Sequence, residues 1–162
     1  LRLAPIDIKL FAYNTFVRPI LEYGNIVWFS FTKQDIAKLE GVQRKAIRFI
    51  FNKYGPHESP TVLMEIAGID TLQRRARIAR LKFMYLIVHN KVNIDGTNFI
   101  TSLQTRPTRH NHTQMLTEYT FHTDCFKNSF FPLTIREWNN LPLHIIESAS
   151  LTQFLTALES VP

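Results

Sequence analysis

Cationic side chains gather in two stretches of the chain, and their chemistry suits phosphate. Residues 70–91 carry six Arg or Lys against one Asp, and residues 33–54 carry six against two carboxylates. The whole chain of 162 residues has a net charge of +6, so everything outside these stretches is slightly acidic. Guanidinium and ammonium groups bind phosphate through charge and N–H donors. The candidate phosphate-binding residues are Arg44, Lys45, Arg48, Arg74, Arg75, Arg77, Arg80 and Lys82.

Runs of charge on a helix are often no more than a solvated face, and that alternative stays open. The uneven distribution favours the other interpretation, because a basic patch on a slightly acidic body is typical of a localised electrostatic footprint.

A second group of side chains has metal-ligand character. His110, His112, His122 and Cys125 follow an H-x-H then H-x₂-C pattern, which could in principle close a tetrahedral Zn²⁺ site. The spacing is not one of the common zinc spacings, so exposed or hydrogen-bonding histidines are the favoured interpretation and no metal site is assigned.

Catalytic motifs are absent from the sequence. The thirteen carboxylates are isolated along the chain, the five glycines are scattered, and neither a phosphate-binding loop nor a nucleophile elbow occurs. We therefore expect no catalysis by this chain alone, no catalytic residues and no cofactor within it.

Two long amphipathic helices should position the cations. The first covers residues 32–54, with Thr32 and Asp35 as a capping box. Gly41 lies in its interior, where glycine is less favourable than alanine. The second covers residues 70–90, with Asp70 as its N-cap. Its apolar stripe is expected to be Leu72, Ala76, Ala79, Phe83, Leu86 and Ile87.

The rest of the chain predicts shorter elements. Helices are expected at 5–17, ending or kinking at Pro19, at 60–67 before Gly68, near 132–139, and at 148–158. Residues 18–31 should be buried. Their pattern favours helix, with a break at Gly24. Both Trp28 and Trp138 should lie in the core. Residues 91–125 lose apolar periodicity and predict a long irregular polar stretch, with an extended piece at 115–121.

The expected fold class is thus all-α, with about six helices, two of them long and basic. The expected divisions are a helical region at 1–92, a polar linker at 93–125 and a short C-terminal helical segment at 126–162.

Four blocks, taken in order, resemble the C-terminal tail of reverse transcriptases from non-LTR (LINE-like) retrotransposons. They are RPILEYGNIVW (18–28), DIAKLEGVQRKAIRFI (35–50), GIDTLQRRARIARLKFMYLIVHNKV (68–92) and KNSFFPLTIREWNNLP (127–142). One departure is Leu133, where the family's FFP block often continues with a basic residue.

The resemblance implies a parent polypeptide with an endonuclease and an RNA-directed DNA polymerase. The family's catalytic aspartates lie in a Tyr-x-Asp-Asp motif of the palm, with Mg²⁺, and this sequence has no such motif. It implies that this chain is the post-palm, thumb-like region, whose partners are RNA, DNA or an RNA–DNA hybrid and the palm and fingers domains.

Three functions remain open. The chain binds the template–primer backbone without sequence preference, or it is an interaction segment that docks on the palm, or it is a non-functional remnant of a dead element. We expect no membrane partner, because no run of eighteen apolar residues occurs. The missing initiator Met suggests a fragment of a longer chain, and the single cysteine suggests a reducing, intracellular compartment, nuclear or cytoplasmic.

Overall fold

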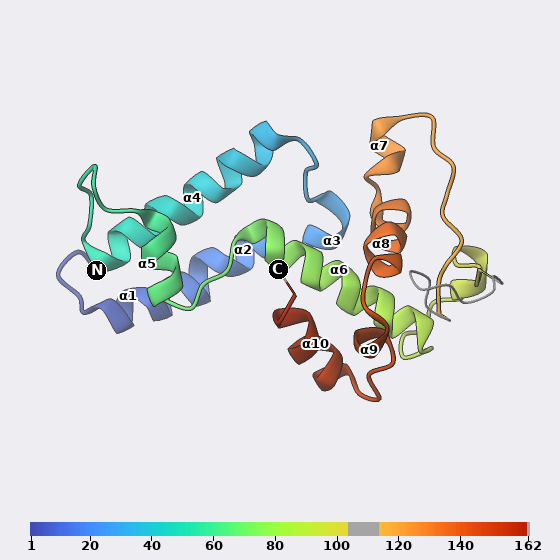
Figure 1. Ribbon diagram of the computed structural model, residues 1–162. Helices are drawn as coiled ribbons and strands as arrows, with labels where there is room; N and C mark the ends of the chain where they lie inside the picture. The colour runs from blue at the N-terminus through green and yellow to red at the C-terminus, as the bar shows by residue number, and fades with distance from the viewer. Residues whose placement is uncertain (104–113, 162) are drawn as a thin grey trace. The chain divides into compact units, whose positions relative to one another are not determined.

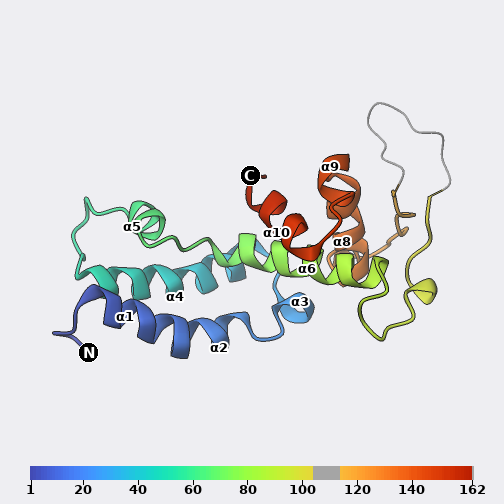
Figure 2. The ribbon, with the colours of Figure 1, turned by 90° about the horizontal axis from the view of Figure 1, so that it is seen from below.

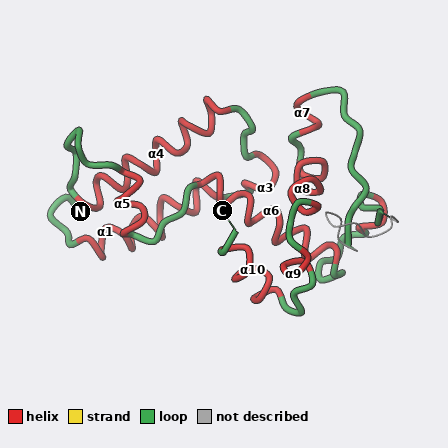
Figure 3. The backbone as a smooth tube through the Cα atoms, viewed as in Figure 1, coloured by secondary structure: helices red, strands yellow, loops and turns green. Residues whose placement is uncertain are grey.

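The computed structural model describes residues 1–103 and 114–161, and the regular secondary structure of that part of the chain consists of helices joined by loops (Figure 1). Figure 3 shows no strand there; the only pairing of extended backbone is an isolated antiparallel bridge between Ser102 and Leu116. Six of the described α-helices have seven or more residues, so the prediction of an all-α fold is confirmed.

The chain divides into two compact units, Leu1–Ala76 and Arg77–Pro162, and the division falls inside helix α6 (Leu72–Val88). The boundary suggested by the sequence lay later, at residues 92 and 93. The two differ because Leu81, Met84 and Tyr85, in the second half of α6, belong to the core formed by the C-terminal helices.

In the first unit, the chain begins with α1 (Ile6–Ala12), a π-helical turn η1 (Tyr13–Val17) and α2 (Arg18–Glu22). The sequence predicts an end or a kink at Pro19, and the helix does not end there. A proline ring collides with the carbonyl four residues earlier, here Thr15, and the wider π turn lies at that point, so the helical path continues. Gly24 does break the helix, with φ of 62°, before the short α3 (Asn25–Trp28).

Helix α4 (Lys33–Phe51) begins where the capping box predicted. The Thr32 Oγ1 accepts the Asp35 amide at 3.2 Å and donates to the Asp35 carboxylate at 2.7 Å. Asn52, with φ of 54°, ends the helix in the left-handed conformation. Helix α5 (Pro60–Ile66) follows, and Gly68, with φ of 63°, stops it as expected.

The core of the first unit lies where α1, η1 and α5 pack on α4 (Figure 2). Tyr13, Ile47, Ile50, Leu63 and Met64 are buried in it. Trp28 is 44% exposed, so its expected place in the core was wrong.

Helix α6 starts one residue later than an Asp70 cap would place it. The Arg74 amide donates to Thr71 Oγ1 at 3.1 Å, and the Gln73 amide donates to Glu40 Oε1 at 3.0 Å. Thr71 is therefore the N-cap, and the expectation for Asp70 was wrong.

The buried side of α6 also differs from the predicted stripe. Leu72, Ala76 and Ile87 are buried as expected, whereas Ala79, Phe83 and Leu86 are only partly buried. In its second half, the buried face widens to take in residues on the side where the C-terminal helices pack; these are Arg80, Leu81, Met84 and Tyr85.

The second unit continues with a 3₁₀ turn η2 (Gly96–Asn98), α7 (Asp124–Lys127), α8 (Phe130–Asn139), α9 (Leu143–Ile146) and α10 (Leu151–Glu159). Trp138 is fully buried, as predicted, beside Ile135, Ile145 and Phe154. None of the described helices is both long enough and apolar enough to span a membrane.

The expected extended piece is present and is held by α8. Asn139 Nδ2 donates to the Leu116 carbonyl and its Oδ1 accepts the Leu116 amide, each at 2.9 Å. Trp138 Nε1 donates to the Gln114 carbonyl at 3.1 Å. The Asn139 side chain thus bonds one edge of this backbone, while residues 101–103 bond the other through the bridge at Ser102.

Candidate nucleic-acid interface

Arg75, one of the predicted phosphate ligands, lies inside the first unit in a polar network. Its Nη2 donates to Gln43 Oε1 at 2.7 Å, and its Nη1 donates to the Asp70 carbonyl at 3.1 Å. Its Nε lies 2.7 Å from Glu22 Oε1, and the side chain is only 10% exposed. Tyr13 donates to the same Gln43 oxygen at 2.8 Å. The Arg75 charge is therefore already matched by the fold.

Gln43 is the centre of this network and is fully buried on α4. Its Nε2 donates to the Asp70 carbonyl at 2.9 Å, while its oxygen accepts Tyr13 and Arg75. Burial raises the pKa of the Tyr13 hydroxyl, which keeps it protonated as a donor.

Arg80 has a comparable role in the second unit. Its Nη2 and Nε donate to the two carboxylate oxygens of Glu137 at 2.8 and 3.3 Å, and its side chain is 9% exposed. This forked geometry is the strong form of the Arg–carboxylate pair. Arg80 thus fastens α6 to α8.

Three other candidates are partly engaged. Arg48 donates to the carbonyls of Gly55 and Glu58 at 3.4 and 3.3 Å, which ties the loop after α4 to the helix. Arg74 Nε lies 3.6 Å from Asp70 Oδ1. Arg77 is partly buried and has interactions of its own.

The remaining candidates, Arg44, Lys45 and Lys82, are exposed. Lys45 and Lys82 have no ion-pair partner among the described residues, and Arg44 donates only to the Ala37 carbonyl, at 3.3 Å.

Two further exposed cations of α4, Lys33 and Lys38, lie on the same side as Arg44 and Lys45. At 3.6 residues per turn, these positions and Arg48 fall within an arc of about 140°. We call this surface the α4 basic face; it consists of Lys33, Lys38, Arg44, Lys45 and Arg48.

The acidic residues of α4 lie at the edges of this arc. Asp35 pairs with Lys38 at 3.2 Å and with Thr32, which lowers the pKa of its carboxyl group. Glu40 accepts the Gln73 amide at the start of α6. Among the described residues, Lys38 is therefore the α4 cation that is ion-paired with a carboxylate of its own helix, and Arg44, Lys45 and Arg48 are not.

The predicted phosphate-binding residues left out Lys33 and Lys38, although both belong to the basic stretch at residues 33–54. The partners Glu22, Gln43 and Glu137 were not predicted either. Gln43 did give a signal, because it stands at an apolar position between Ile36 and Ile50 at heptad spacing, where a buried polar group needs partners.

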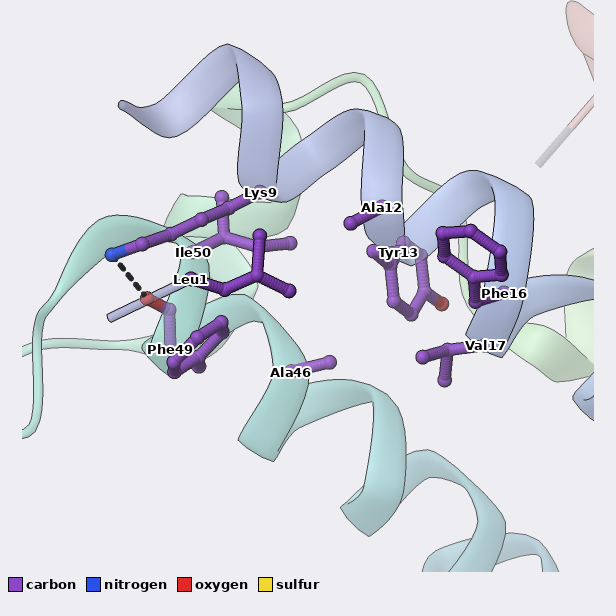
Figure 4. A pocket seen from close by; sticks show the side chains of 9 residues that line it. All are labelled: Leu1, Lys9, Ala12, Tyr13, Phe16, Val17, Ala46, Phe49 and Ile50. Atoms are coloured by element: carbon purple, nitrogen blue, oxygen red, sulfur yellow. Dashed lines mark hydrogen bonds between the residues drawn. The ribbon is translucent and has the colours of Figure 1, made fainter. Parts of the chain in front are cut away.

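A separate pocket of about 160 Å³ lies between α1, η1 and α4, with almost entirely apolar walls (Figure 4). Its one charged residue, Lys9, is buried, and its ammonium donates to the Phe49 carbonyl at 3.3 Å and to Asn52 Oδ1 at 2.8 Å. A cation there complements the negative end of the α4 dipole, so Lys9 is accounted for by the fold.

The predicted metal-like residues divide into two groups. His110 and His112 lie outside the described residues, and His122 and Cys125 are exposed. The described part of the chain has no cluster of three or more His, Cys, Asp or Glu that could hold a metal ion.

Comparison with models of protein families, with curated proteins and with solved structures finds no match to this chain.

Proposed function

We propose that the chain is the thumb-like, C-terminal segment of a non-LTR retrotransposon reverse transcriptase, and that it binds the backbone of the template–primer. The observation that carries this proposal is the α4 basic face, where exposed cations share one arc and the acidic side chains of the helix are turned to its edges. Such a surface suits a chain of phosphates better than a single anion.

The binding mechanism is electrostatic. Lys33, Lys38, Arg44 and Lys45 neutralise phosphates and release condensed counterions, so affinity falls steeply as salt rises. Contacts of this kind fix the position of the duplex and carry no base information. The segment therefore holds the template–primer in place while other domains of the polymerase carry the catalytic metal ions.

Arg75 and Arg80 act differently in this proposal. Their guanidinium groups are matched by Glu22 and Glu137, so they fix α6 against the neighbouring helices and contribute to binding only by holding the fold.

The resemblance supports the proposal through three of its four blocks. Glu22 belongs to the first block, Gln43 to the second and Arg75 to the third, and they meet in one buried network. Residues that resemble the family in separate stretches thus act together in the fold.

The test is fluorescence anisotropy of a labelled RNA–DNA hybrid with the whole chain. The variant Arg44→Glu/Lys45→Glu reverses two charges of the α4 basic face. The control Arg2→Glu/Lys91→Glu makes the same change in net charge at exposed positions outside α4. We expect the first variant to lose at least about tenfold in affinity and the control to lose much less. Equal losses would reduce the effect to net charge and overturn the proposal.

A second function is supported by a different observation. Large apolar side chains are exposed along α1 to α3; they include Phe11, Phe16, Ile20, Tyr23 and Val27. Exposed apolar surface of this kind is typical of protein interfaces, and the alternative proposal is that it docks on the palm. Under this alternative we expect the isolated chain to self-associate through these side chains and Phe16→Ser/Ile20→Ser to shift it toward the monomer in sedimentation; the same sedimentation profile for parent and variant would argue against docking.

A further inference from the structure

Gly41 stands in the interior of α4, where glycine is unfavourable. It costs a helix about 1 kcal/mol relative to alanine, because the unfolded chain loses more freedom when glycine is ordered. Interior glycines persist where the backbone needs a positive φ or where a neighbour leaves no room for a side chain.

Neither reason applies here. The glycines with positive φ are Gly24 and Gly68, and Gly41 has ordinary helical geometry. A Cβ built on Gly41 would meet no heavy atom within 4 Å, so it would point into open space. Nothing in the described residues of this chain requires a glycine at that position.

The position lies in the middle of the α4 basic face. Lys38 is three residues earlier, Arg44 and Lys45 are three and four residues later, and Arg48 is seven later. Side chains three, four and seven residues apart are neighbours on a helix surface. Ala37 is exposed and lies four residues before Gly41, so it is a neighbouring position on this face with a short side chain. Long cationic side chains therefore surround Gly41, which is partly exposed, and no heavy atom lies within 4 Å of the place its Cβ would take.

We infer that Gly41 is the point of closest approach between α4 and the phosphodiester backbone of a nucleic-acid duplex. This inference rests on the proposed function. The missing side chain lets phosphate oxygens approach the helix, where they make close van der Waals contacts and weak contacts with the Cα hydrogens of Gly41. The surrounding Lys and Arg side chains reach the same phosphates from both sides.

The inference predicts that stability and binding change in opposite directions. Gly41→Ala and Gly41→Leu both add helix propensity, and the Cβ that they share meets no heavy atom within 4 Å, so both variants should unfold at a higher temperature than the parent. The same side chains hold the duplex away from the helix. We expect affinity for the labelled RNA–DNA hybrid to fall about threefold for Ala and about tenfold for Leu, the loss of one or two contacts.

The matched control is Thr156→Ala, which removes a β-branched residue from an exposed position of α10. It should raise the unfolding temperature and leave affinity unchanged, which separates a stability effect from a binding effect. Affinity of the Gly41 variants equal to or above that of the parent would overturn the inference.

The charge-reversal variants show which idea has failed. If Arg44→Glu/Lys45→Glu weakens binding and the Gly41 variants do not, only the role of Gly41 is wrong. If none of these variants binds less tightly than the parent, the proposed function is wrong as well. Tight binding of the parent to anionic lipid vesicles with none to the hybrid would also overturn both.

Discussion

Arg75 of α6 and Glu22 of α2 form a close ion pair inside the first unit, with 2.7 Å between Nε and Oε1. Arg75 belongs to the densest run of cations in the sequence, yet its side chain lies among Gln43, Asp70 and Glu22. Cationic residues of the two basic stretches thus differ in their surroundings, since Arg75 is held inside the fold whereas Arg44 and Lys45 of the α4 basic face are exposed.

Arg75→Gln should destabilise the chain. It leaves Glu22 with Arg18 as its one remaining cation among the described residues and disrupts the bonds around Gln43, so the free energy of unfolding should fall by about 2–3 kcal/mol. Urea unfolding measures this change. Arg75→Lys keeps the charge but loses the planar fork, so it should recover only part of the stability. A variant with parental stability and weakened hybrid binding would instead make Arg75 a phosphate ligand.

Arg80 and Glu137 should be energetically coupled. In a double-mutant cycle with Arg80→Met and Glu137→Leu, each single change leaves a partly buried charge unpaired, whereas the double variant leaves none. We expect a coupling energy of about 1–3 kcal/mol from thermal or urea unfolding. Additive single effects would show that the pair contributes nothing beyond its separate side chains.

Asn139 should hold the extended segment at Leu116. Asn139→Ala removes both bonds to the Leu116 backbone and leaves its buried amide without an acceptor, at a cost of about 2 kcal/mol. Hydrogen exchange should show lost protection at the Leu116 amide. The control Asn140→Ala changes the exposed neighbour on the same helix and should leave that amide protected. Retained protection in Asn139→Ala would contradict the role assigned to Asn139.

His89 should make the chain less stable in mild acid. Burial lowers the pKa of His89, Lys91 lowers it further, and the ring lies against Tyr85 with 4.1 Å between centroids. Because the folded pKa is below the ordinary value of about 6.5, the unfolded chain binds the proton more readily. The unfolding free energy should therefore fall as pH drops below about 6.5.

His89→Gln tests this pH dependence, because it should flatten the curve of unfolding free energy between neutral and mildly acidic pH. His144→Gln, at an exposed position, is the control and should keep the parental curve. The same fall in both variants would assign the effect to another group.

Local chemistry in the sequence was enough to place several features of the fold. The capping box at Thr32 and Asp35 and the helix stops at Gly24 and Gly68 depend on neighbouring residues alone. Amphipathic periodicity likewise placed α4, α6 and α8. These predictions succeeded because a few adjacent side chains determine them.

Features that depend on distant residues could not be found in this way. Glu137 lies 57 residues from Arg80, so the buried pair between them has no local signature. Thr71 and Asp70 are both residue types that cap helices, and it is Thr71 that accepts the Arg74 amide, while the Asp70 carbonyl accepts bonds from the distant Gln43 and from Arg75. The π turn before Pro19 keeps a helix where the local rule predicts a break. The set of candidate phosphate-binding residues differs from the predicted one for the same reason, because partners distant in sequence determine which cations are exposed.

The central claim is that exposed cations of α4 bind a phosphate backbone, and the salt dependence of hybrid binding tests it most directly. If Lys33, Lys38, Arg44 and Lys45 each neutralise one phosphate, the plot of log affinity against log salt should have a slope of about −3 to −4. Reversal of Arg44 and Lys45 should reduce that slope by about two. A shallow slope in the parent chain, or a slope that the reversal leaves unchanged, would contradict the claim.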